Sequence, residues 1–186
     1  MVERTAVREV KQCFVLSDKA KALANRNITE FKDGLVELKN KVNEMSDSDL
    51  DSYPPLRSRV QEYNHLTWLW GAVSIDEIGV WPRAAGIPCE LCLGSVRETA
   101  SGIRKRGGVE ALPVGADNRA KENIPGIINV AEVISKERLL SVIGLAGGII
   151  RKPPHKRMRW DLDDGSVRSV AFALAGIESL NGFLGV

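Results

Sequence analysis

The sequence predicts an all-α fold, an irregular bundle of about six helices joined by long loops. Two observations support this class. Apolar residues recur every three or four positions in several segments, which is the period of a helix, and few runs alternate apolar and polar residues over the length of a strand. Glycines and prolines separate these segments and predict loops at 74–87, 107–128 and 147–165. We therefore expect one helical domain over residues 1–186.

The clearest helical segment lies between residues 28 and 45. Six apolar residues share one side of it: Ile28, Phe31, Leu35, Leu38, Val42 and Met45. We favour packing inside the bundle, because the repeat is shorter than the heptad series of a free coiled coil. The alternative is that this stripe binds a partner helix from another protein.

Prolines and capping residues predict where the other helices begin. Pro54-Pro55 and Pro88 suit the first turn of two helices, which extend to about Val73 and Arg106. A capping pattern, Asn129 with Glu132, begins the next helix, and Ser166 caps the last one.

The two ends of the chain each leave an alternative open. Residues 2–17 fit a helix or a short strand, of which we favour the helix, and residues 1–16 could form an arm that orders on a neighbouring molecule. The apolar tail 181–186 could dock on the same chain or on a neighbour.

Overall composition indicates a globular protein but no particular partner. The 26 basic and 24 acidic residues give a net charge of only +2, so bulk charge favours neither nucleic acid nor an acidic partner. No apolar run reaches the roughly 18 residues of a membrane-spanning helix, and no signal-peptide core follows Met1. Three cysteines fit reduced thiols, and we expect a cytoplasmic protein, or a virion component if the chain is viral.

The densest positive charge lies between Gly147 and Trp160. The segment carries Arg151, Lys152, His155, Lys156, Arg157 and Arg159 with no acid among them. Its Pro-Pro pair favours an extended path, which can follow a phosphate backbone, and Trp160 could stack on a base. We expect this basic loop to bind single-stranded RNA with little sequence specificity.

Five further cations could join the basic loop if the fold brings them together. They are Arg104, Lys105, Arg106, Arg119 and Lys121. The alternative is a solvated loop whose charge is neutralised by the acids that follow it, with Trp160 packed on the core; acidic proteins or lipids are further candidate partners.

Aromatic and apolar residues outside the periodic stripes suggest contacts between subunits. Trp68, Trp70 and Trp81 are candidates, as are Phe183 and Leu184 in the tail. For Trp68 and Trp70 we favour the core, since a large ring is most often buried.

No motif in the sequence predicts catalysis or a cofactor. Cys89 and Cys92 form a lone C-x-x-C without further zinc ligands nearby, so we favour two small helical residues over a zinc or redox site. His65 and His155 have no neighbours that suggest a catalytic triad, and no glycine-rich loop precedes a helix. We expect a protein that is not an enzyme and has no metal.

Taken together, these patterns predict a self-assembling RNA-binding protein of the coat or nucleocapsid type. The alternative is a helical adaptor that binds another protein through the 28–45 stripe or the tryptophan-rich helix.

Overall fold

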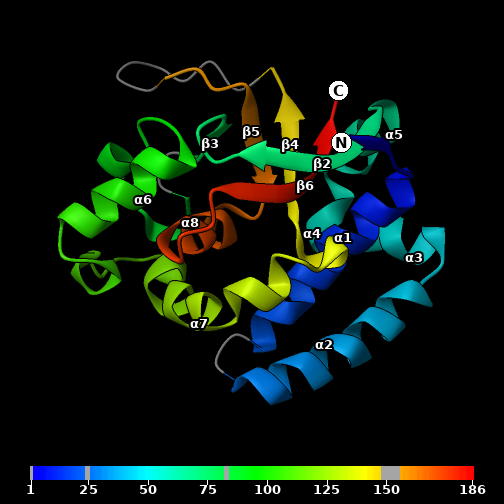
Figure 1. The fold of residues 1–186 in the computed structure, drawn as a ribbon. Helices are drawn as coiled ribbons and strands as arrows, with labels where there is room; N and C mark the ends of the chain where they lie inside the picture. The colour runs from blue at the N-terminus through cyan, green and yellow to red at the C-terminus, as the bar shows by residue number, and fades with distance from the viewer. Residues whose placement is uncertain (1, 24–25, 82–83, 148–155) are drawn as a thin grey trace.

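The computed structural model describes residues 2–23, 26–81, 84–147 and 156–186, and it shows a mixed β-sheet with helices packed against it. In Figure 1, α1, α7 and α8 lie below the sheet, and α2 lies beyond α1, farthest from the strands. The all-α prediction is therefore wrong, because six strands form one sheet.

The sheet joins segments from both ends of the chain. Its strands, in spatial order, are β1 (Glu3–Arg4), β2 (Trp68–Ser74), β6 (Ser179–Gly185), β4 (Val142–Ala146), β5 (Trp160–Asp164) and β3 (Ile78–Gly79). The β4–β6 and β3–β5 pairs are parallel, and the other pairs are antiparallel. Since β1 and β6 flank β2, the two termini lie near each other (Figure 1).

The sequence does not predict the strands, because they lack the alternation of apolar and polar residues that marks a half-exposed strand. The first three residues of β4 are all buried, as are the last four of β6, so both faces of these strands are apolar. β5 reads Trp-Asp-Leu-Asp-Asp, and aspartate is uncommon in strands. β4 lies at the end of the helix predicted from Asn129, β5 lies in the predicted loop 147–165, and β6 includes most of the apolar tail 181–186.

Eight α-helices are present in the described residues. They are α1 (Val7–Lys19), α2 (Ile28–Asn43), α3 (Asp47–Ser52), α4 (Pro54–Arg57), α5 (Val60–His65), α6 (Val96–Lys105), α7 (Arg119–Ile134) and α8 (Ser166–Leu174).

The helix predicted over residues 28–45 is confirmed as α2. Its cap is Asn27, whose side chain accepts hydrogen bonds from the backbone N–H groups of Thr29 and Glu30 at 3.1 and 3.0 Å. Phe31, Leu35 and Val42 are buried, and α2 packs against α1. The stripe therefore serves mainly the core of its own chain, as we favoured.

Both ends of the chain belong to the core. Residues 7–19 form α1, and its positions 10–17 are all buried, so this segment is no separate arm. The apolar tail docks on its own chain as β6, between β2 and β4.

Two long predicted helices are divided by strands. The helix expected from Pro54 to Val73 is two short helices, α4 and α5, followed by β2. The helix expected from Asn129 lies inside α7, which already begins at Arg119 and contains Pro125; the chain then enters β4. Strand pairing with distant residues overrides the local periodicity in both places.

Candidate functional site

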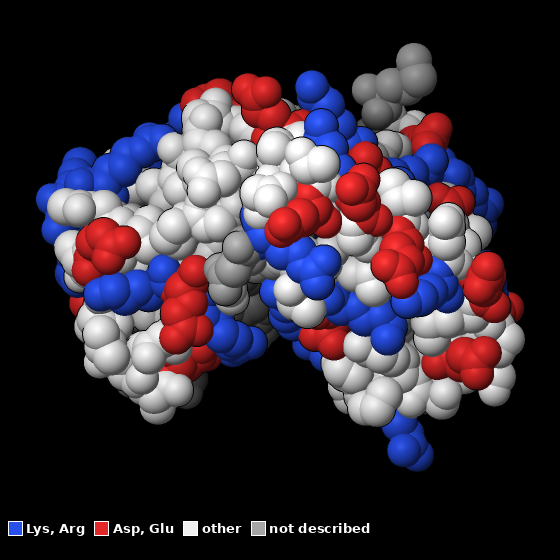
Figure 2. Space-filling view, turned by 90° about the horizontal axis from the view of Figure 1, so that it is seen from below, with Lys and Arg blue, Asp and Glu red and all other residues white. Residues whose placement is uncertain are grey.

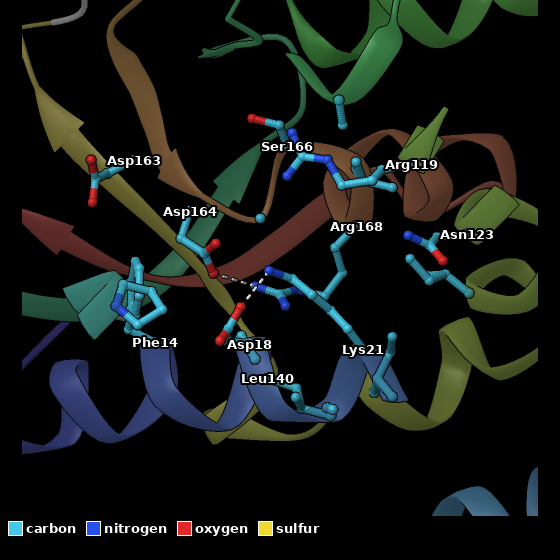
Figure 3. A pocket seen from close by; sticks show the side chains of 18 of the residues that line it. Phe14, Asp18, Lys21, Arg119, Asn123, Leu140, Asp163, Asp164, Ser166 and Arg168 are labelled. Atoms are coloured by element: carbon cyan, nitrogen blue, oxygen red, sulfur yellow. Dashed lines mark hydrogen bonds and ion pairs between the residues drawn. The ribbon is translucent and has the colours of Figure 1, made fainter. Parts of the chain in front are cut away.

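A cavity of about 420 Å³ lies between α1, α7 and the start of α8 (Figure 3). Part of its wall is apolar and comes from α1, α2, α7 and the β3–α6 connection: Phe14, Phe31, Ile127, Val130, Ile134 and Trp81. Polar and charged side chains from α1, from Arg59 just before α5, and from β5, α7 and α8 complete the wall. A volume of this size with a mixed lining is typical of small-molecule sites.

Asp18 contributes a carboxylate from the C-terminal part of α1. It pairs with Lys21 at 2.6 Å and accepts a hydrogen bond from the Tyr53 hydroxyl at 2.7 Å. Burial alone would raise the pKa of Asp18, but the bonds from Lys21 and Tyr53 outweigh burial and hold this pKa below its ordinary value. The carboxylate is therefore charged near neutral pH.

Asp163 enters the cavity from β5. Its carboxylate accepts hydrogen bonds from Arg59 Nε at 2.9 Å and from the Tyr63 hydroxyl. The Tyr63 ring is fully buried and meets Trp68 edge to face. Burial, and then the negative charge of Asp163, raise the pKa of Tyr63, so its hydroxyl stays protonated and donates to Asp163.

Asp164, the last residue of β5, pairs with Arg168 of α8 at 3.1 Å. Arg168 also donates to the carbonyl of Ser141 at 2.8 Å, and its side chain is 12% exposed. Its Nε–H is buried and has no acceptor in the part of the chain that the structure describes. Figure 3 shows Arg168 and Lys21 directed into the same region between Asp164 and Asp18.

The start of α8 forms another part of the cavity wall. Gly165 precedes the helix in the left-handed conformation, at φ 95°, and provides no side-chain cap. A β-carbon there would lie 2.9 Å from Arg168 Nη2, so glycine suits this position. Figure 3 shows Arg119 of α7 pointing toward Ser166 at this helix start.

The basic loop is only partly described. Arg151, Lys152 and His155 lie outside the described residues. Lys156 forms an ion pair with Glu98, and Arg159 pairs with Glu77 at 3.0 Å. Arg157 is exposed and donates to the Gly147 carbonyl at 3.3 Å.

Trp160 does not present a ring for base stacking. It is the first residue of β5, is 7% exposed and lies between β4 and β3 in the sheet. Trp160 instead packs in the core, as the alternative prediction proposed.

The other predicted cations are dispersed. Arg104 donates to the carbonyls of Ala173 and Leu174 at the end of α8, both at 2.9 Å. Arg106 pairs with Glu90 at 3.1 Å, Lys121 donates to the carbonyls of Glu110 and Leu112 between α6 and α7, and Lys105 is exposed. Of this group only Arg119 lines the cavity.

Acidic and basic side chains are interspersed on the face seen in Figure 2. No single sign dominates this face, which is the view from the α2 and α7 side of the molecule. The pattern agrees with the low net charge of +2.

The predicted interface residues have different surroundings. Trp68, Phe183 and Leu184 are buried in the sheet, and Trp68 donates to the Tyr63 carbonyl at 2.8 Å. Trp70 is half-buried, with its ring against Phe183 and the Arg138 guanidinium. Among these predicted interface residues Trp81 is the most exposed, at 42%, and it lines the cavity.

Cys89 and Cys92 lie before α6, in and just after a short 3₁₀ turn, and neither forms a disulfide. Within the described ranges, no three His, Cys, Asp or Glu side chains are grouped so that they could hold a metal ion. No helix in these ranges is long and apolar enough to cross a membrane.

The sequence prediction missed the cavity. The alternative for the basic loop, in which the acids that follow it neutralise its charge, does not hold for Asp163 and Asp164, which bond to Arg59 and Arg168. A detectable signal was the closely spaced aspartates followed by Gly165 and Ser166. Their partners are distant in sequence, so the site itself could not be read from local spacing.

Comparisons with known proteins add no relationship: no family model matches the sequence, and neither a curated protein nor a solved structure is significantly similar to it.

Proposed function

We propose that this protein binds a small organic molecule in the cavity between α1, α7 and α8. The observation that carries the proposal is the cavity itself, about 420 Å³ with an apolar wall on one side and charged groups on the other. Its polar groups are held in place by the bonds among Asp18, Asp163, Asp164 and their partners. Such preorganisation lowers the entropic cost of binding.

The proposal is for binding and not for catalysis. A general acid or base that works near neutral pH needs a pKa close to that pH. The pKa of Asp18 is instead held low by Lys21 and Tyr53 against the effect of burial, and Asp163 already accepts two hydrogen bonds. These carboxylates are better suited to fixing the shape of the cavity than to moving protons.

A cavity-filling variant tests the proposal. Asn123 lines the cavity from α7, so Asn123→Trp should fill part of it, while Glu122→Trp adds the same ring at the preceding, exposed position. Ligand-observed NMR with a library of small organic compounds would compare both variants with the parent chain.

We expect compounds that bind the parent chain and Glu122→Trp but lose binding to Asn123→Trp. Circular dichroism would establish that both variants remain folded. If no compound discriminates between the two variants, the cavity is not a ligand site.

RNA binding with self-assembly, of the coat or nucleocapsid type, is the second candidate function. The observation that favours it is the position of Lys156, Arg157 and Arg159, which are all exposed and directly follow the undescribed segment 148–155. Among the described residues Arg157 has only a carbonyl partner, which leaves its charge available to a phosphate. Lys156 and Arg159 would have to exchange their present acidic partners for phosphates.

A further inference from the structure

We propose that the ligand of this cavity is an organic anion, with its acidic group beside Arg119 and Ser166 and its apolar body against α7. This inference rests on the proposed binding function and adds the chemical class and orientation of the ligand. Carboxylates and phosphates share the required chemistry, which is a negatively charged group with several acceptor oxygens.

The charge balance of the cavity wall is the first argument. Four basic side chains line it, Lys21, Arg59, Arg119 and Arg168, together with three aspartates. Each aspartate is paired with one of these cations, but none of the three pairs with Arg119.

Arg119 instead pairs with Asp117 at 2.7 Å, and Asp117 is not among the lining residues. The described wall therefore carries one more positive than negative charge, and that charge belongs to a side chain which points toward Ser166 (Figure 3). The Arg119 side chain is 60% exposed, so an anion can reach it from solvent.

The supply of hydrogen-bond donors is the second argument. The buried Nε–H of Arg168 has no acceptor in the described part of the chain, although a buried charged donor without a partner is costly. Ser166 and the amide of Asn123 add donors at the wall. The first backbone N–H groups of α8 have no side-chain cap, because the preceding residue is Gly165. Ligand oxygens would satisfy such donors.

The apolar wall is the third argument, and it fixes the orientation. Ile127, Val130 and Ile134 lie on one side of α7, further along the helix than Arg119 and Asn123. A ligand whose acidic group meets Arg119 would extend its carbon body along these three apolar side chains of α7 toward Phe31 and Leu140. A fully polar anion would make no apolar contacts with this side of α7.

Three probes of similar shape test the inference by isothermal titration calorimetry: 4-methylbenzoate, 4-methylphenyl phosphate and the neutral 4-methylbenzamide. We expect at least one of the anions to bind tighter than the amide by about tenfold or more, since charge-assisted hydrogen bonds are the stronger ones. The tighter of the two anions identifies the source of the charge as carboxylate or phosphate.

Two arginine variants locate the anion. Arg119→Gln should remove most of the preference for the anion over the amide. Arg106→Gln should keep it, because Arg106 is a similarly exposed, ion-paired arginine that does not line the cavity. Asn123→Trp should abolish binding of all three probes.

The outcomes separate this inference from the function on which it rests. If the amide binds as tightly as both anions, or if Arg119→Gln keeps the preference, the cavity binds small molecules but the anion assignment is wrong. If none of the probes binds and the compound library also yields no Asn123→Trp-sensitive ligand, both proposals are wrong.

Discussion

At the scale of single residues, the three aspartates that line the cavity are each bonded to a basic side chain of the protein. Asp18 shows the consequence most directly, since Lys21 and Tyr53 both donate to it and its pKa lies below the ordinary value of 3.8. A carboxyl whose pKa is lowered by folding stabilises the folded state above its unfolded pKa. That contribution is lost as the pH falls through the folded pKa.

We therefore predict that Asp18→Asn lowers stability at neutral pH and that the difference disappears in acid. A partly exposed ion pair contributes on the order of 1 kcal/mol, or a shift of about 2–4 °C in the melting temperature of a chain this long. Thermal unfolding followed by circular dichroism, from neutral pH to well below the ordinary carboxyl pKa, measures the difference. Asp33→Asn, at an exposed site on α2, is the control. A constant difference at every pH would contradict the role assigned to Asp18.

At the scale of elements, the parallel pairing of β4 with β6 depends on a close approach at Gly182. A β-carbon at this position would lie 2.9 Å from both the carbonyl oxygen and Cγ2 of Val142. The corresponding nearest atom for Gly144, in the neighbouring strand, is 3.6 Å away. Neither glycine has a left-handed backbone, so an alanine at either site differs in contacts and not in strain of that kind.

We predict that Gly182→Ala destabilises the fold by about 1–3 kcal/mol, the usual cost of overpacking, because β6 must move away from β4. Gly144→Ala should be neutral or stabilising by up to about 1 kcal/mol, since alanine restricts the unfolded chain more than glycine does. Denaturant unfolding of both variants measures the free energies. Equal losses would mean that the β4–β6 spacing is not set at Gly182.

Local periodicity predicted the helices better than the strands. The apolar spacing predicts α2 within a few residues, whereas the predicted cap of α8 is wrong: Ser166 is its first residue, and Gly165 precedes it without a side-chain cap. The strands β4 and β6 are short, buried on both faces and paired across about forty residues, so no local pattern distinguishes them from buried helix segments. The cavity is still less predictable, because its ion pair between Arg59 and Asp163 joins segments about a hundred residues apart.

At the scale of the whole molecule, the sheet buries most of the residues predicted to form contacts between subunits. Trp68, Phe183 and Leu184 fill its core, and Trp70 lies beneath Arg138. The cation predicted to act with the basic loop from α7, Arg119, lies in the cavity instead. The two candidate functions therefore differ in what the intact protein should do in solution.

We predict that the chain, purified without nuclease, elutes at a mass close to that of a single chain, 20.4 kDa, and carries little nucleic acid. Size-exclusion chromatography with light scattering measures the mass, and the ratio of nucleic-acid to protein absorbance measures the bound RNA. The reason is that ligand binding in the cavity needs only one chain, and that Lys156 and Arg159 are already paired with Glu98 and Glu77. A large particle that is rich in RNA and dissociates at high salt would favour the second candidate. In that case the double variant Arg157→Glu, Arg159→Glu should lose the RNA and keep its circular dichroism, since both side chains are exposed.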